Sequence, residues 1–215
     1  RLNLEGANAA PRVMRPRLLG LEDLGESGAD HLVDVREPLA YAAGHMQGAV
    51  CLPVGMIPAF AGWFISEGDT IALIASEEDE LAQAMAHLVR IGLDNIVGGY
   101  VGVIPAAAQG KAMQSIAMID TEEVARRLAE DSEDWTLLDV RALDERQQGS
   151  IDGSEHVYVG ELNTRWKELD RDRHYTLMCA SGMRASVAAG WLASQGFKHL
   201  DVYLGSMGAW TNAQG

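Results

Sequence analysis

Cysteine and histidine are scarce in this 215-residue chain, which contains two cysteines, Cys51 and Cys179, and six histidines. So few thiols exclude a disulfide scaffold and favour a reducing compartment, so we expect the protein in the cytoplasm. No histidines stand at the spacing typical of zinc ligands, and we expect no metal site in this chain. No apolar run approaches the ~20 residues that a membrane-spanning helix needs, so we expect no membrane association.

Positive charge is scarce as well, because 17 lysines and arginines face 31 aspartates and glutamates, for a net charge of −14. A protein that binds nucleic acid by neutralising phosphates needs the opposite balance, so we expect no nucleic-acid partner. Any anion site must therefore be local, built from loop amides or from one positioned arginine. The start of the chain lacks the pattern of a signal peptide, and because it begins with Arg1 instead of Met we expect a fragment or a processed protein.

The sequence contains an internal repeat. A shift of 105 positions (139 − 34) superposes Asp-Val-Arg at 34–36 on Asp-Val-Arg at 139–141, and it also superposes three pairs of glycines. The run IALIAS at 71–76 falls on YTLMCA at 175–180 when the shift is reduced by one. Two copies of one unit of about 100 residues explain these matches. We therefore predict a linker or the tail of an upstream domain at 1–12, a first domain at 13–107 and a second domain at 115–215, with a linking segment around 106–114.

Each unit alternates short apolar runs with helical patterns. In the first unit we predict a strand at 71–75 and a helix from Glu78 to Arg90. In the second unit, a helix is predicted after an N-cap at Thr121 and another between Gly182 and Ser194. The runs that predict strands there lie at 115–119, 135–141, 156–159, 174–179 and 199–203. This alternation favours an α/β fold in which each unit is a mainly parallel sheet flanked by helices.

The segment after Cys179 has the features of an anion-binding loop. Cys179 stands at the carboxyl end of a predicted strand, where ligands bind in sheets of this kind. The loop and the helix start that follow can direct several backbone amides at one point, which favours a thiolate. Gly182 permits an unusual backbone angle, and Arg184 adds a fixed positive charge. These parts predict an activated nucleophile, whereas Cys51 is interpreted as core packing and His45 as a structural histidine.

The pattern Cys-x-Ser-Gly-x-Arg from Cys179 to Arg184 resembles the active-site loop of the rhodanese sulfurtransferases. Three more segments are similar to signatures of that family: Asp-Val-Arg at 139–141, Gly-His-Met-Gln-Gly-Ala at 44–49 and Gly-Ser-Met-Gly-Ala-Trp at 205–210. The resemblance covers about residues 18–215 and implies two rhodanese-like domains.

In that family the loop cysteine takes a sulfane sulfur from thiosulfate or another donor and passes it to cyanide, a thiol or a partner protein, with no cofactor. The resemblance therefore implies Cys179 as the catalytic residue, with small sulfur-containing anions or thiols as substrates and no cofactor in this chain. Asp139 and Arg141 would support the site, either by contacting the substrate or as a structural ion pair. The implied substrate-binding residues are Ala180, Ser181, Gly182, Met183, Arg184 and Ala185. Related dual-specificity phosphatases have a loop one residue longer, so this shorter loop favours sulfur over phosphate.

The first repeat departs from the family pattern. Ala75 stands in the place of Cys179, and Glu80 stands in the place of Arg184, within the run Ser-Glu-Glu-Asp-Glu at 76–80. Alanine cannot hold a persulfide, and clustered carboxylates repel an anion. We therefore predict that this copy is inactive and has a structural, docking or substrate-shaping role.

The opening run Leu-Asn-Leu-Glu-Gly at 2–6 resembles the end of the metallo-β-lactamase-like domain in persulfide dioxygenase–rhodanese fusions. In those proteins an inactive rhodanese precedes an active one, as here. This resemblance implies a low-molecular-weight persulfide as the substrate, a fused or associated metallo-β-lactamase-like domain, and iron in that upstream domain. Two functions stay open: a sulfurtransferase that works through a Cys179 persulfide, and a non-catalytic docking or redox-sensing module of a fused metalloenzyme. The sequence also leaves open the sulfur donor, the acceptor and the oligomeric state.

Overall fold

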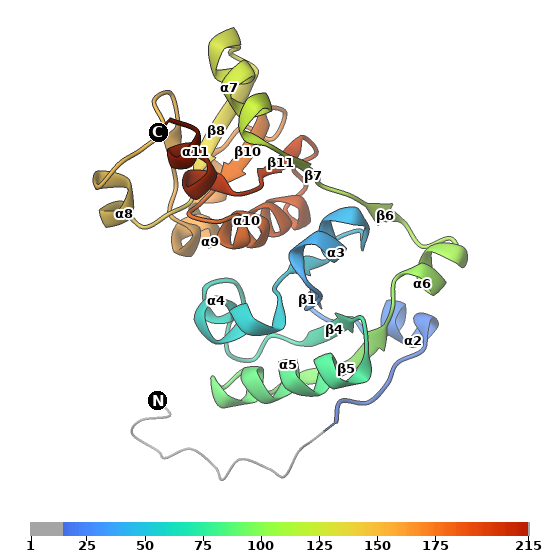
Figure 1. Ribbon diagram of the computed structural model, residues 1–215. Helices are drawn as coiled ribbons and strands as arrows, with labels where there is room; N and C mark the ends of the chain where they lie inside the picture. Colours follow the sequence, from blue (N-terminus) through green and yellow to red (C-terminus); the bar gives the residue numbers. More distant parts are fainter. Residues whose placement is uncertain (1–14, 215) are drawn as a thin grey trace, which may run out of the picture. The chain divides into compact units, whose positions relative to one another are not determined.

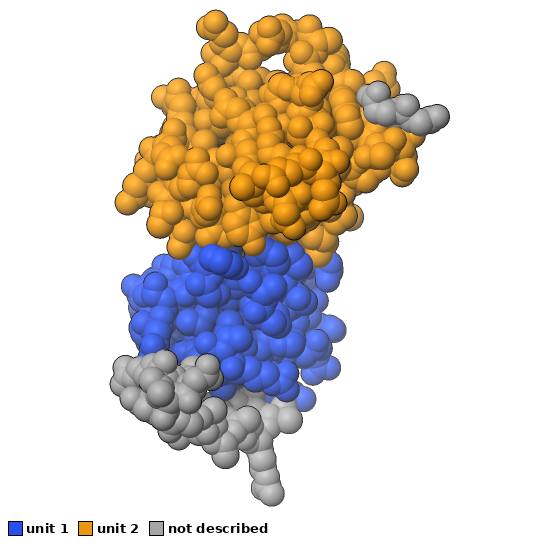
Figure 2. Space-filling model, turned by 90° about the vertical axis from the view of Figure 1, so that its left-hand side faces the viewer, with its two compact units in different colours: residues 1–37, 52–113 blue, residues 38–51, 114–215 orange. Residues whose placement is uncertain are grey.

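The computed structural model describes residues 15–214 of the chain. By their contacts the residues divide into two compact units, shown in Figure 2. Unit 1 consists of two segments, the chain up to Glu37 and Leu52–Met113. Unit 2 consists of Pro38–Cys51 and the chain from Gln114 onward. The segment 38–51 thus groups with the second repeat by its contacts, whereas the repeat pattern places it in the first domain. The predicted tail at 1–12, including the run at 2–6, lies outside the described residues.

A four-stranded sheet is built from the first repeat. Its order is β3-β1-β4-β5, and β4 (Ile71–Ala75) pairs in parallel with β1 (His31–Asp34) and with β5 (Ile96–Val101). Every residue of β4 is buried, which explains the uninterrupted apolar run of that strand. The helices are α2 (Leu21–Glu26), η1 (Val54–Met56), α4 (Ile57–Phe64), α5 (Glu78–Arg90) and α6 (Ile104–Ala108). The predicted strand at 71–75 and the predicted helix Glu78–Arg90 are confirmed at their predicted bounds.

The segment 38–51 contains α3 (Pro38–Ala43), β2 (His45–Met46) and β3 (Val50–Cys51). The buried His45 ring stacks on Tyr41 with 3.8 Å between ring centroids, and its Nδ1 donates to the Tyr41 carbonyl at 3.0 Å. Cys51 is fully buried, and a Cβ added at Gly190 would overlap its Cβ, so only glycine fits there. Both residues therefore have the structural roles that the sequence predicts.

The second repeat forms a five-stranded sheet in the order β7-β11-β10-β8-β9, and every pairing in it is parallel. Its strands are β7 (Ala117–Ile119), β8 (Trp135–Asp139), β9 (Glu155–His156), β10 (His174–Met178) and β11 (Leu200–Tyr203). Its helices are α7 (Thr121–Glu130), α8 (Leu143–Gln147), η2 (Val159–Glu161), α9 (Leu162–Arg165), η3 (Trp166–Glu168), α10 (Met183–Ser194) and α11 (Ser206–Gln214). Figure 1 shows α7 and α10 on opposite sides of this sheet. The predicted α/β fold class, with parallel sheets flanked by helices, is confirmed.

Two local predictions need correction. The N-cap of α7 is Asp120 instead of Thr121, because the Asp120 carboxylate accepts the Glu123 amide at 2.9 Å. The strand predicted at 156–159 ends at His156, and the chain then turns into η2. The segment predicted to link the two domains, 106–114, contains the end of α6 and the short strand β6 (Met113–Gln114), which pairs with β2.

The core of unit 2 joins the sheet to the helices that cover it. Its buried cluster draws residues from α7, β8, β10, β11 and the loop after α8: Val124, Leu137, Met178, Tyr203 and Ile151. Met207 and Trp210 of α11 pack against this cluster, so the last helix is attached to the sheet beside the end of β10. In the described part of the chain, no helix is long and apolar enough to cross a membrane.

Candidate functional site: a cysteine loop at a helix N-terminus

Cys179 follows β10 directly and precedes α10 by a short loop. Gly182 is the N-cap of α10 and has φ 100°, a left-handed conformation that side chains resist. This turn brings the Gly182 amide within 3.1 Å of the Cys179 Sγ, to which it donates. The thiol is 1% exposed and lies at the positive end of a 12-residue helix. Amide donation and the helix dipole both favour negative charge on the sulfur.

The C-terminal segment holds this loop in place. The Cys179 amide donates to the Ser206 hydroxyl at 3.1 Å, and that hydroxyl donates to the Tyr203 carbonyl at 2.8 Å. The amides of Met207 and Gly208 donate to the carbonyls of Cys179 and Ala180, each at 3.0 Å. Ser206 is fully buried and has φ 49°, so its geometry is fixed by these bonds. The segment that resembles the family's closing signature thus anchors the backbone at Cys179 and Ala180.

Arg184 reaches back from the first turn of α10 to a carboxylate on α8. Its two terminal nitrogens donate to Glu145 at 2.5 and 2.7 Å, a two-bond ion pair. The pKa of Arg184 is raised, first by these hydrogen bonds and also by its interactions with Cys179. The pKa of Glu145 is lowered, first by Arg184 and also by the Ala142 amide that donates to it at 3.1 Å. The guanidinium therefore interacts with both the Glu145 carboxylate and the Cys179 thiol, and the lowered pKa keeps the carboxylate ionised at neutral pH.

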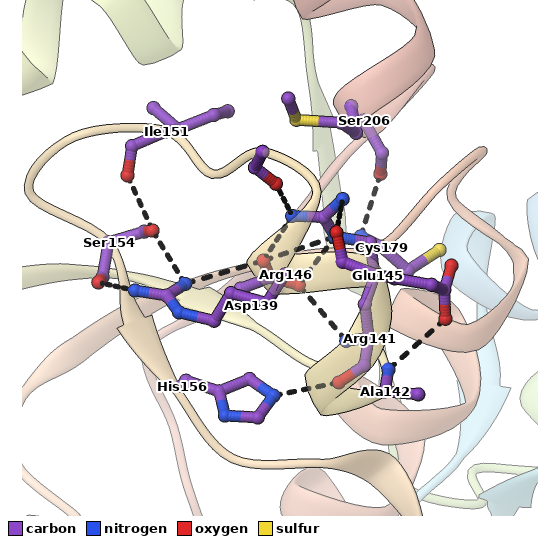
Figure 3. A network of polar contacts seen from close by, with 12 residues as sticks. Asp139, Arg141, Ala142, Glu145, Arg146, Ile151, Ser154, His156, Cys179 and Ser206 are labelled. Carbon is purple, nitrogen blue, oxygen red and sulfur yellow. Dashed lines mark hydrogen bonds and ion pairs between the residues drawn. The ribbon is translucent and has the colours of Figure 1, made fainter.

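Asp139 and Arg141 form a buried ion pair, drawn in Figure 3. Arg141 donates to both carboxylate oxygens, at 3.0 Å through Nε and 2.7 Å through Nη2, and to the Gly149 carbonyl at 2.8 Å. His156 donates through Nε2 to the Arg141 carbonyl at 2.8 Å. Arg146 lies 3.4 Å from Asp139, so the network fixes the loop after β8. The geometry favours the structural interpretation of the pair over substrate contact.

The predicted loop residues take different positions. Ala180, Ser181 and Met183 are exposed, Arg184 is half-buried, and Gly182 and Ala185 are buried. Sequence reasoning missed Glu145 altogether and did not assign Ser206 a contact with Cys179. The signal for Glu145 is its place three residues after the helix cap at Ala142, the position of an acidic capping residue.

The first repeat fills its equivalent loop with its own carboxylate. The Ser76 amide donates to the Glu80 side chain at 2.7 Å, and α5 begins at Glu78. A loop amide that could face an external anion is thus already bonded within the chain. Yet this unit keeps the buried pair Asp34–Arg36, with Nη2 2.6 Å from the carboxylate. The fold is shared by the two repeats, whereas the anion loop with a cysteine belongs to the second.

The two repeats each form an α/β unit with a parallel sheet, and the second has a cysteine loop at the N-terminus of a helix. A model of the Rhodanese-like domain matches this chain at residues 20–105 and 120–213. These two matches cover most of the chain, which therefore belongs to the rhodanese-like domain family.

Curated relatives are named as sulfur-transferring proteins. The putative sulfurtransferase YtwF of Bacillus subtilis is 35% identical over 95 residues, which are 44% of this chain and 90% of that protein. A sulfurtransferase of Allochromatium vinosum is 34% identical over 92 residues, 43% of this chain and 85% of that protein. The putative sulfur carrier protein YrkF of Bacillus subtilis is 33% identical over 97 residues, 45% of this chain and 52% of that protein.

Proposed function

We propose that this protein is a sulfurtransferase that moves a sulfane sulfur atom from thiosulfate or a low-molecular-weight persulfide to a thiol, sulfite or cyanide. The observation that carries the proposal is the Cys179 Sγ held by the Gly182 amide at the N-terminus of α10. Sulfurtransferase relatives and the matched family support it.

The proposed reaction has two steps. The Cys179 thiolate attacks the outer sulfur of thiosulfate, a new S–S bond forms, and the electron pair of the broken bond leaves with sulfite. With an organic persulfide, RS–SH, the leaving group is the thiolate RS⁻ and the proton stays on the transferred sulfur. In the second step an acceptor such as cyanide attacks the outer sulfur of the Cys179 persulfide, which releases thiocyanate and restores the thiolate. Loop amides and Arg184 stabilise the sulfur anion in both steps.

The first experiment measures the intact mass of the protein after incubation with thiosulfate or with glutathione persulfide, then after addition of cyanide. We expect the gain of one sulfur atom on Cys179 and its loss to cyanide, with thiocyanate formed over many cycles. The Cys179→Ser variant should form no persulfide and show no turnover. A folded, reduced protein that gains no sulfur from either donor contradicts the proposal and favours a docking or redox-sensing module.

We also propose that this chain works in the cytoplasm beside a fused or associated metallo-β-lactamase-like domain that carries iron. The resemblance of residues 2–6 and the order of the copies, in which the one without the cysteine precedes the one with it, support this. The sequence of the full-length natural protein tests the fusion: we expect it to contain a metallo-β-lactamase-like domain before these residues, and its absence contradicts the fusion.

A further inference from the structure

We propose that Glu145 sets the charge preference of the sulfur donor: it neutralises Arg184 beside Cys179 and so favours an organic persulfide of low charge over the dianion thiosulfate. This inference rests on the proposed sulfurtransferase function and names the donor class of that same site.

The carboxylate of Glu145 is held firmly against Arg184. Oε1 accepts a hydrogen bond from one guanidinium nitrogen. Oε2 accepts hydrogen bonds from the other guanidinium nitrogen and from the Ala142 amide. The Arg184 side chain is 20% exposed and that of Glu145 is 33% exposed, so water screens the pair only in part. An arginine with both terminal nitrogens on a carboxylate offers an incoming anion little net charge. The pair therefore shapes the site without making it strongly cationic.

The two repeats share one fold, but the ion pair between Glu145 and Arg184 has no counterpart in the first repeat, so the fold does not require this pair. The repeat shift places Ala40 at the position of Glu145 and Glu80 at the position of Arg184, so both partners are replaced in the copy without a cysteine. By contrast, the ion pair between the aspartate and the arginine of the Asp-Val-Arg run is present in both copies. A pair that is present only beside the cysteine is tied to the chemistry of the cysteine.

The rim of the loop is apolar. Among the described residues after Gln114, the large apolar side chains that stand exposed are Leu143, Met183 and Leu204, at 60%, 37% and 49%. Met183 belongs to the loop, and the Leu204 side chain lies 3.8 Å from a Cβ built on Gly182. Leu143 stands two residues before Glu145 on α8, where helix geometry points it to another side, so Met183 and Leu204 are the apolar groups beside the loop. A carbon-containing donor can bury part of its surface on these groups, whereas thiosulfate has no apolar part to bury. The neutralised charge of Arg184 and the apolar groups beside the loop thus both favour an organic persulfide of low charge.

The test compares single-turnover rates of persulfide formation on Cys179, followed by mass, for thiosulfate and for 2-hydroxyethyl persulfide, an organic donor with no charged group besides its sulfur. Glu145→Gln keeps the shape and the acceptor oxygen but removes the negative charge. We expect the ratio of the thiosulfate rate constant to the persulfide rate constant to rise about tenfold in this variant, because Arg184 then presents its full charge to the dianion. Glu145→Asp, which keeps the charge, should leave the ratio within about threefold of wild type.

Asp144→Asn is the matched control, because it removes an equal charge from the adjacent, exposed position of α8. Its ratio should stay within about twofold of wild type, since exposed charges are screened. An unchanged ratio in folded Glu145→Gln, or an equal rise in Asp144→Asn, overturns the assignment of donor preference to Glu145. Failure of wild-type protein to load sulfur from either donor is a different result, which contradicts the sulfurtransferase function itself.

Discussion

The buried pair Asp139–Arg141 gives the sharpest test of whether these residues maintain the fold or bind the substrate. In Asp139→Ala the Arg141 guanidinium, whose side chain is 6% exposed, loses a carboxylate that it contacts through Nε and Nη2. Removal of one partner from a buried ion pair costs about 3–5 kcal/mol, because the other charge stays buried without its counter-charge. That is a large part of the ~5–15 kcal/mol that stabilises a typical domain.

Urea unfolding followed by tryptophan fluorescence measures this loss. Four of the five tryptophans lie after residue 114, so the signal reports mainly the unfolding of unit 2. With a slope of about 2 kcal/mol per molar urea, the midpoint should fall by about 2 M.

The equivalent pair in the first repeat provides the control. Asp34→Ala removes the same kind of buried carboxylate, with Nη2 of Arg36 2.6 Å away, and should destabilise unit 1 by a similar amount. Sulfur loading of Cys179 should persist in this variant, because the cysteine loop belongs to unit 2. An unchanged urea midpoint in Asp139→Ala together with a raised KM for thiosulfate would refute the structural interpretation and assign the pair to substrate binding.

Three further predictions concern the loop. Arg184→Ala should reduce the rate with thiosulfate more than the rate with an uncharged polysulfide, because it leaves the Glu145 carboxylate unpaired beside the thiol; equal losses in steady-state kinetics count against this charge argument. Ser206→Ala should cost about 1–3 kcal/mol in urea unfolding, because it leaves the buried Cys179 amide without its acceptor, whereas Thr211→Ala on the exposed face of α11 should change stability by less than about 0.5 kcal/mol; equal effects contradict the anchoring role. Because the pKa of Glu145 lies below its ordinary value of 4.5, the stabilisation from its ion pair is complete above that pH and is lost as the pH falls through the lowered pKa. The stability difference between wild type and Glu145→Gln should therefore shrink below pH 4.5, and a difference that is constant with pH shows that the pair does not stabilise the fold.

The sequence by itself determined the fold class and the duplication, and it predicted Cys179 as the candidate nucleophile. A continuous apolar run such as 71–75 predicts a buried strand, because a parallel sheet is covered on both faces. A glycine three residues after Cys179 and a small-residue helix behind it mark a tight strand–loop–helix turn. These signals depend only on residues that are close together along the chain, so the sequence alone shows them. The sequence alone also shows that the first repeat has Ala75 at the position of Cys179.

Only the tertiary structure decided which partners complete the site. Glu145 lies 39 positions from Arg184, and Ser206 lies 27 positions from Cys179, and no periodic pattern links either pair. The structure also showed that the pair Asp139–Arg141 belongs to the buried network after β8. The contacts of segment 38–51 group it with unit 2. Hydrogen bonds and ion pairs of this kind depend on distances of about 3 Å between side chains that the sheet brings together, and such distances are set by the packing of the whole unit rather than by spacing along the chain.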